Sequence, residues 1–126
     1  MIDNAMGLLR QGLVEAPLHF DFVMGSKGSQ PATARQLVFL SESIPVDATW
    51  TVAGLGRHQL TMGILAIGMG GHVRVGLEDN IYYRYGELAS NEQLVARMAR
   101  ITDEAEREVA APEEAREIMS LKASDQ

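Results

Sequence analysis

Arginine and acidic residues gather in one short stretch of this 126-residue sequence, residues 71–80 (GHVRVGLEDN). If residues 72–77 form a β-strand, an unbroken apolar face of valine and leucine lies on one side, and Arg74 and Glu78 lie on the other. Glu78 and Asp79 then stand at the carboxyl end of the strand, where active sites of parallel α/β folds assemble. Carboxylates there can accept a proton or bind a metal. A surface edge strand with solvated charges is the alternative, and the apolar face argues against it.

A glycine-rich turn, residues 53–59 (AGLGRHQ), is the second candidate site. It follows a β-branched and aromatic run at residues 48–55 and leads into a helical pattern. Gly54 and Gly56 would therefore let backbone N–H groups approach a ligand at the start of a helix. Arg57 would strengthen binding of an anion there. A tight turn without a ligand explains the same spacing equally well.

The first strand-like run, residues 18–24 (LHFDFVM), alternates polar and apolar side chains. His19 and Asp21 share the polar face. A buried Asp21 could pair with Arg74, and a hydrogen-bonded position in the core is expected for His19. None of the three histidines stands at HxH or HExxH spacing, and there are no cysteines, so no complete metal site can be read from these residues.

Apolar runs of strand length alternate with helical patterns along the chain. Strands are expected near residues 18–24, 48–55 and 72–77, and helices near residues 3–12, 32–42, 58–69, 91–109 and from Pro112. Ser90 and Gln93 have the spacing of a capping box at the start of the longest helix. The segment between the last strand and that helix is read as irregular. This alternation indicates parallel βα units, because each parallel pairing needs a crossover helix.

Several residues in these elements are assigned to packing. Trp50 is expected in the core, and Gly63 and Gly68 are expected to let the helix at residues 58–69 approach the sheet closely. Gln59, at the start of that helix, is read as a capping or surface residue.

Three βα units do not make a closed barrel, which takes eight strands and ~250 residues. The expected fold class is therefore α/β, a single partial domain over residues 1–126 that forms part of a (β/α)₈ TIM barrel. A small open three-layer α/β domain is the alternative, and its unpaired strand edges would be a liability.

Charge and composition narrow the partners and the compartment. The formal charge of −6 argues against non-specific binding of nucleic acid, which needs a basic face. The most apolar run, residues 60–69, is about half the ~20 residues needed to span a bilayer, so no membrane association is expected. The start of the chain lacks the pattern of a secretory signal, and the absence of cysteine fits a reducing, cytoplasmic setting.

Several stretches resemble, in the same order, the β-keto acid cleavage enzymes, the family that includes 3-keto-5-aminohexanoate cleavage enzyme. They are GLV and PLHF (residues 12–14 and 17–20), TVAGLGRHQ (51–59), GGHVRVGLEDN (70–80) and APEEARE (111–117). The RVGLED segment is long and specific. The resemblance covers essentially the whole chain and implies the C-terminal three βα units of the family's (β/α)₈ barrel.

The resemblance also implies a reaction in which a β-keto acid and acetyl-CoA give acetoacetate and a new acyl-CoA. One zinc ion would be bound by an HxH pair and a glutamate; Glu78 matches the glutamate, and the HxH pair belongs to an early strand outside this sequence. Asp79 matches the aspartate proposed as general base, and Arg74 matches the arginine coupled to it. In such a site zinc polarises the keto oxygen, the carboxylate removes the α-proton, and the guanidinium keeps that carboxylate ionised and oriented.

The remaining expectations concern ligands and assembly. The Gly54–Gly56 turn with Arg57 would border the mouth of the site, where the thioester of acetyl-CoA or its phosphates would sit. The chain is read as a truncated copy that is inactive alone, and the full-length protein is expected to form a homo-oligomer. One alternative is a non-catalytic α/β module that self-associates or pairs with a complementary half-barrel. Another is a small anion-binding domain that uses the same turn. The sequence does not indicate which β-keto acid is used.

Overall fold

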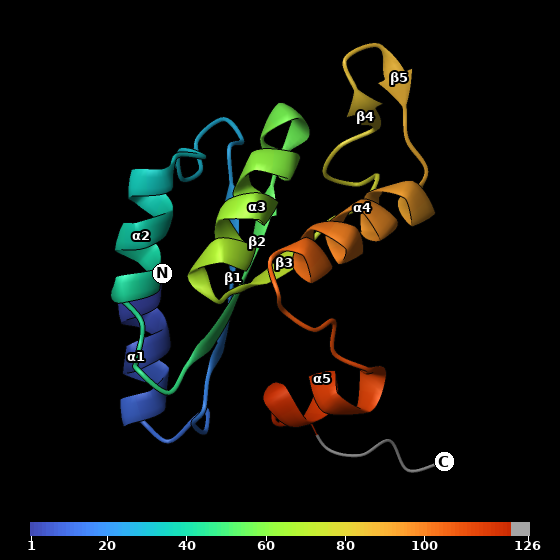
Figure 1. Ribbon diagram of the computed structural model, residues 1–126. Coiled ribbons are helices and arrows are strands. Elements are labelled where there is room, and N and C mark those ends of the chain that lie inside the picture. Colours follow the sequence, from blue (N-terminus) through green and yellow to red (C-terminus); the bar gives the residue numbers. More distant parts are fainter. Residues whose placement is uncertain (122–126) are drawn as a thin grey trace.

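A three-stranded parallel sheet is the centre of the computed structural model, which describes residues 1–121 (Figure 1). Its strands are hydrogen-bonded in the order β1 (His19–Met24), β2 (Thr49–Gly54) and β3 (His72–Arg74). Helix α2 (Ala34–Glu42) joins β1 to β2, and a 3-10 turn, η1 (Gly56–His58), with helix α3 (Gln59–Met69) joins β2 to β3. The predicted α/β class and the parallel βα units are confirmed.

The remaining elements flank this sheet. They are α1 (Ile2–Arg10), an antiparallel hairpin of β4 (Tyr82–Arg84) and β5 (Glu87–Leu88), α4 (Asn91–Glu104) and α5 (Pro112–Ile118). The predicted capping box is present at the start of α4, where Ser90 and Gln93 bond each other's backbone N–H groups. Of the single domain expected over residues 1–126, residues 122–126 lie outside the described part.

The apolar core lies between the sheet and the helices α2 and α3. Phe20, Phe22 and Met24 of β1 are buried there, and the Phe22 ring packs at a tilt against the ring of Trp50 with centroids 5.8 Å apart. Burying an aromatic or long aliphatic side chain contributes about 1.5–3 kcal/mol each. Trp50 is therefore a core residue, as predicted.

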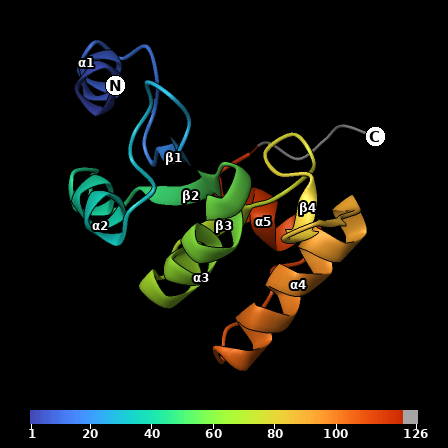
Figure 2. The same ribbon diagram turned by 90° about the horizontal axis from the view of Figure 1, so that it is seen from above.

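The opposite face of the sheet carries polar side chains. His19 and Asp21 are exposed on it, and His19 is hydrogen-bonded to the hydroxyls of Thr49 (2.8 Å) and Thr51 (2.9 Å). The prediction that His19 lies in the core is wrong, because strand alternation puts it on the face that α2 and α3 do not cover. Helix α5 lies on this side, where Ile118 helps to line a small cavity against His19 and Thr51 (Figure 2).

Strand β3 is shorter than predicted. It ends at Arg74 rather than at residue 77, and the chain turns so that the Gly76 carbonyl accepts from the N–H groups of Asp79 (3.2 Å) and Asn80 (3.1 Å). Leu77 is exposed instead of completing an apolar face, and Glu78 lies in the turn rather than on the strand. The hydrogen-bonded pairing of β3 with β2 stops here because the Gly76 carbonyl bonds N–H groups of its own turn and not those of a neighbouring strand.

Two further boundaries differ from the predictions. The helix expected at residues 91–109 ends at Glu104, and Glu106 has a φ of 56° that no helix continues through. The segment read as irregular forms the β4–β5 hairpin, whose two-residue loop has Gly86 at a φ of 77°. A glycine tolerates this left-handed conformation at no steric cost.

Two glycines allow close packing around α3. A Cβ atom on Gly71 would overlap the Trp50 ring, and one on Gly63 would lie 2.8 Å from the Met98 sulfur and 3.2 Å from Cγ1 of Val73 in β3. The prediction that Gly63 lets the helix approach the sheet closely is confirmed. The same prediction for Gly68 is wrong, because nothing lies within 4 Å of a Cβ there.

No helix within residues 1–121 is both long enough and apolar enough to cross a membrane.

Substituting Gly71 by alanine should destabilise the fold, because the new methyl group would overlap the ring of Trp50, which is buried in the core. We expect a loss of about 1–3 kcal/mol in the free energy of unfolding, measured by urea denaturation followed by circular dichroism. Gly68→Ala is the matched control: it adds the same methyl group to an open part of α3 and should be neutral or gain up to about 1 kcal/mol. Equal stability of the two variants would contradict the packing described here.

Candidate active site

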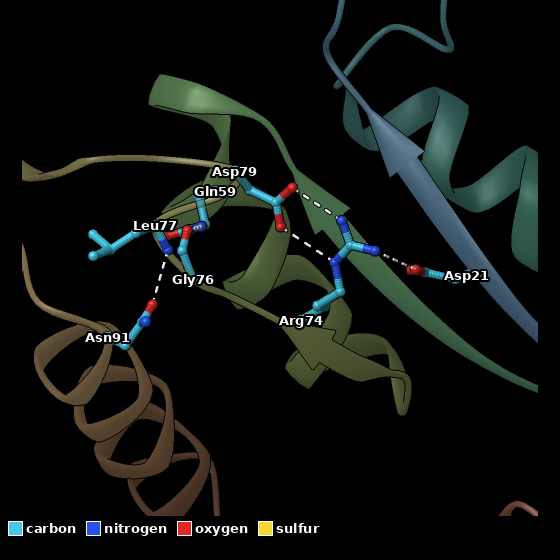
Figure 3. Close-up of polar contacts among 7 residues, drawn as sticks. All are labelled: Asp21, Gln59, Arg74, Gly76, Leu77, Asp79 and Asn91. Carbon is cyan, nitrogen blue, oxygen red and sulfur yellow. Dashed lines mark hydrogen bonds and ion pairs between the residues drawn. The ribbon is translucent and has the colours of Figure 1, made fainter.

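Arg74 lies between two carboxylates at the carboxyl edge of the sheet (Figure 3). Its Nη1 donates to Asp21 Oδ2 at 2.8 Å, while its Nε and Nη2 donate to the two oxygens of Asp79 at 3.2 and 2.9 Å. The pairing with Asp79 is bidentate, which fixes the plane of that carboxylate as well as its position. The Asp79 side chain is only 5% exposed, against 40% for Arg74. Asp79 is therefore the sheltered, oriented member of the group.

The surroundings of Arg74 stabilise its positive charge. The hydrogen bond to Asp79 raises the pKa of Arg74; burial opposes this, and the negative charges of Asp21, Asp79 and Glu78 add to it. The guanidinium therefore remains a permanent cation. A guanidinium beside a carboxylate in turn favours the ionised form that can act as a base.

Three contacts hold the turn that carries Glu78 and Asp79. The Gln59 side chain, from the start of α3, donates to the Gly76 carbonyl at 3.1 Å, and the Gly56 N–H donates to the Asp79 carbonyl at 2.7 Å. The side chain of Asn91, at the start of α4, accepts from the Leu77 N–H at 2.9 Å. Figure 3 shows the Gln59 and Asn91 contacts meeting the turn from different elements. The turn is thus fixed from η1, α3 and α4 together.

Gln59 is a buried residue that the sequence reasoning misplaced. It is 2% exposed and is the one polar residue among residues 1–121 that is buried as a whole. The signal was available in the helical periodicity: Gln59 begins the stripe that continues through the buried residues Met62, Gly63, Ala66 and Ile67. A polar residue at the head of a buried stripe needs a partner, and Gly76 supplies it.

Glu78 is exposed on the turn, one residue before Asp79. Both oxygens of Asp79 accept hydrogen bonds from Arg74, whereas Glu78 forms no ion pair within residues 1–121. Between residues 1 and 121 no three His, Cys, Asp or Glu side chains are grouped closely enough to hold a metal ion. The donors in the described chain therefore fit one ligand of a zinc site, and not the three protein ligands of a catalytic one.

In the glycine-rich turn, Gly54 is required by the backbone conformation, whereas Gly56 and Arg57 line a cavity. A Cβ on Gly54 would lie 2.6 Å from the carbonyl oxygen of His58, so this glycine is needed by the turn itself. Gly56 has a φ of 55° and open space beside it, and it lines a cavity of about 550 Å³ together with Arg57. Contact of Gly54 with a ligand stays a prediction.

His72 lies on the polar face near His19, with ring centroids 6.1 Å apart. Burial lowers the pKa of His72 below its usual value of 6.5, and the positive charges of His19 and Arg107 act in the same direction. His72 is therefore a neutral imidazole near neutral pH, available for hydrogen bonding.

The fold and the site together indicate a class of protein. A parallel α/β sheet that carries an oriented carboxylate beside a guanidinium at its carboxyl edge has the layout of an α/β enzyme. The sequence model of the β-keto acid cleavage enzymes matches residues 1–121, and the chain belongs to this family. The resemblance given by residues 70–80 is confirmed.

Similar proteins of known activity come from several bacteria. The chain is 58% identical over 123 residues to 3-keto-5-aminohexanoate cleavage enzyme of Fusobacterium nucleatum, covering 97% of this chain and 44% of that protein. It is 49% identical over 122 residues to the enzyme of the same name from Acetoanaerobium sticklandii, covering 96% and 45%. It is 40% identical over 125 residues to 3-oxoadipate:acetyl-CoA acetyltransferase of Cupriavidus necator, covering 96% and 44%. The chain thus spans less than half the length of these relatives.

The lowered pKa of His72 gives the stability of the fold a defined pH dependence. The folded chain binds this proton less readily than the unfolded chain, so the stability from neutral His72 is present above 6.5 and is lost as the pH falls below that value. We expect the urea midpoint to fall between about pH 7 and about pH 5, and to fall less in His72→Gln. His58→Gln is the matched control and should keep the full pH dependence. An identical fall in His72→Gln and in the unsubstituted chain would contradict this assignment.

Proposed function

We propose that this chain is the C-terminal part of a zinc-dependent β-keto acid cleavage enzyme, and that it is inactive without the rest of the barrel. The observation that carries the proposal is the bidentate Arg74–Asp79 pair beside Glu78 at the carboxyl edge of a parallel sheet. The family membership and the activities named for the relatives support it.

The sheet itself supports a barrel completed by further strands. α2 and α3 cover one face, and the other face carries polar side chains, as the interior of a (β/α)₈ barrel with an active site requires. The outer edges of β1 and β3 have no strand partner among residues 1–121. Five more strands would pair both edges, which removes the exposed backbone groups.

Asp79 is the proposed general base. Each carboxylate oxygen has two lone pairs, so Asp79 can accept one hydrogen bond per oxygen from Arg74 and still accept a proton. It would take the proton from the α-carbon of the β-keto acid, which leaves a carbanion that attacks the carbonyl carbon of acetyl-CoA and displaces the CoA thiolate. The thiolate would then attack the original keto carbonyl, and cleavage of the carbon–carbon bond would give the new acyl-CoA and an acetoacetate carbanion that takes the proton back from Asp79. Arg74 would keep Asp79 ionised and oriented before that transfer.

Glu78 is the proposed metal ligand of this chain. Two histidines from the part of the protein outside this sequence would complete the site with it. A zinc ion bound there would supply a Lewis acid for the keto oxygen. Gly54, Gly56 and Arg57 would border the same mouth on the side that receives acetyl-CoA, because Gly56 bonds the backbone of Asp79 directly.

Substitutions of these three residues should separate their roles in an assembled enzyme, made by supplying the N-terminal part of the Fusobacterium nucleatum relative in trans. Glu78→Ala should lose zinc and activity together. Asp79→Asn should keep zinc and lose ~10²–10⁴ in kcat, because an amide cannot accept the α-proton. Arg74→Lys should also lower kcat, because an ammonium lacks the planar fork that binds two oxygens. Zinc content and turnover are the measurements.

Asp47→Asn, which removes an exposed carboxylate from the loop before β2, is the matched control and should leave both quantities unchanged. If the three charges only hold the turn in place, all three variants would lose stability in parallel, and zinc content would follow the folded fraction. Near-normal turnover of a folded, zinc-loaded Asp79→Asn would contradict the role of Asp79.

A non-catalytic module that pairs with another half-barrel is the second candidate, and the open edges of β1 and β3 favour it. Both candidates predict that the chain alone self-associates, since exposed strand edges pair with other chains. Size-exclusion chromatography with light scattering should show dimers or larger species. A monomer with a sharp thermal transition would count against the barrel. Turnover by the assembled enzyme separates the two candidates.

A further inference from the structure

We propose that the cavity between η1, the β4–β5 hairpin and α4 binds the phosphorylated adenosine end of coenzyme A. The cavity has a volume of about 550 Å³, and its walls include Arg57, Asn80, Tyr83, Arg84 and Arg97. The choice of coenzyme A as the source of the nucleotide rests on the proposed function. The fit to a phosphorylated nucleotide rests on the cavity alone.

The cavity is positively charged in an acidic chain. Arg57, Arg84 and Arg97 line it, and no acidic residue does, although the net charge of the chain is −6. Within residues 1–121 none of the three arginines forms an ion pair. Three guanidinium groups around one cavity favour an anion with several oxygens, because each can donate two parallel hydrogen bonds to a phosphate.

Aromatic rings stand beside these charges. Tyr82, Tyr83 and Tyr85 all line the cavity, and the Arg97 guanidinium lies 3.8 Å from the centroid of the Tyr83 ring. Arg97 Nε is buried without a hydrogen-bond partner among residues 1–121, and no ion pair there balances the charge of this side chain. Tyr85 is fully exposed on the hairpin loop. Aromatic faces next to guanidinium groups are suited to a purine base and its phosphates.

The cavity adjoins the proposed active site. Asn80, which lines it, follows Asp79 in the chain, and Gly56, which also lines it, donates its N–H to the Asp79 carbonyl. The walls come from the segments after β2 and β3, and Figure 1 shows the hairpin above the start of α4, on the side of the strand carboxyl ends. In TIM barrels the loops after the last two strands frequently form a phosphate site. A nucleotide held here would therefore bind next to the proposed active site.

Calorimetric titration of the chain with adenosine 3′,5′-bisphosphate, coenzyme A, ADP and inorganic phosphate tests the site. The bisphosphate and coenzyme A should bind, and inorganic phosphate should bind more weakly. Arg57→Gln and Arg84→Gln should each weaken binding ~10-fold or more, because each removes charge-assisted hydrogen bonds to phosphate. Tyr85→Ala should weaken the two nucleotides ~5-fold or more without changing phosphate affinity, because it removes a stacking surface.

Arg35→Gln, which removes the same charge from the exposed surface of α2, is the control and should bind as the unsubstituted chain does. An absence of bisphosphate binding at millimolar concentration by chain that is folded by circular dichroism would overturn the proposal. So would equal affinity for ADP, which lacks the 3′-phosphate, or equal weakening in Arg35→Gln.

The assembled enzyme separates this site from the proposed reaction. Arg57→Gln and Arg84→Gln should raise the KM for acetyl-CoA ~10-fold and leave the KM for the β-keto acid unchanged. Turnover with an unchanged KM for acetyl-CoA in both variants would overturn the nucleotide site and leave the proposed function standing. Nucleotide binding by an assembled enzyme that does not cleave the β-keto acid would support the nucleotide site and overturn the proposed function.

Discussion

The contact on which the site depends is the bridge from Arg74 to Asp79 and Asp21. It joins three separate pieces of the fold, since Arg74 ends β3, Asp21 lies in β1, and Asp79 lies in the turn beyond β3. Removing one partner of a buried charge pair costs ~3–5 kcal/mol, and the cost here is lower because Arg74 is 40% exposed. The same bridge sets the position of a sheltered carboxylate at the edge where parallel sheets carry their chemistry. Stability and the proposed catalysis therefore use the same atoms.

Hydrogen bonds to the backbone of the turn after β3 also hold the site in place. Gln59 and Gly56 hold the turn from the α3 side, and Asn91 holds it from α4, so the carboxylates of Glu78 and Asp79 extend from a fixed backbone. Such fixation matters because a catalytic group must be positioned before the reaction rather than during it. It also explains why a buried glutamine is retained at the start of an otherwise apolar helix stripe.

Much of the fold could be predicted from local patterns. The alternation of Phe20, Phe22 and Met24 with polar residues fixed the face of β1, and the same reasoning brought Asp21 toward Arg74 across 53 positions of sequence. The end of β3 could not be predicted in this way, because it depends on which groups the Gly76 carbonyl meets in three dimensions. The β4–β5 hairpin was missed because its side chains are largely exposed and show no buried alternation, so only the Tyr85–Gly86 loop marked it. The pairing of Arg74 with Asp79 came from the family resemblance, and the structure adds its geometry.

Proton abstraction can be measured apart from the rest of the reaction. The assembled enzyme is incubated with a β-keto acid in D₂O without acetyl-CoA, and the loss of the α-proton signal is followed by NMR above the uncatalysed exchange. If Asp79 held by Arg74 is the base, the enzyme should accelerate this exchange, and Asp79→Asn should slow it by ~10²–10⁴ while zinc stays bound. Exchange at the unsubstituted rate in zinc-loaded Asp79→Asn would contradict the central claim.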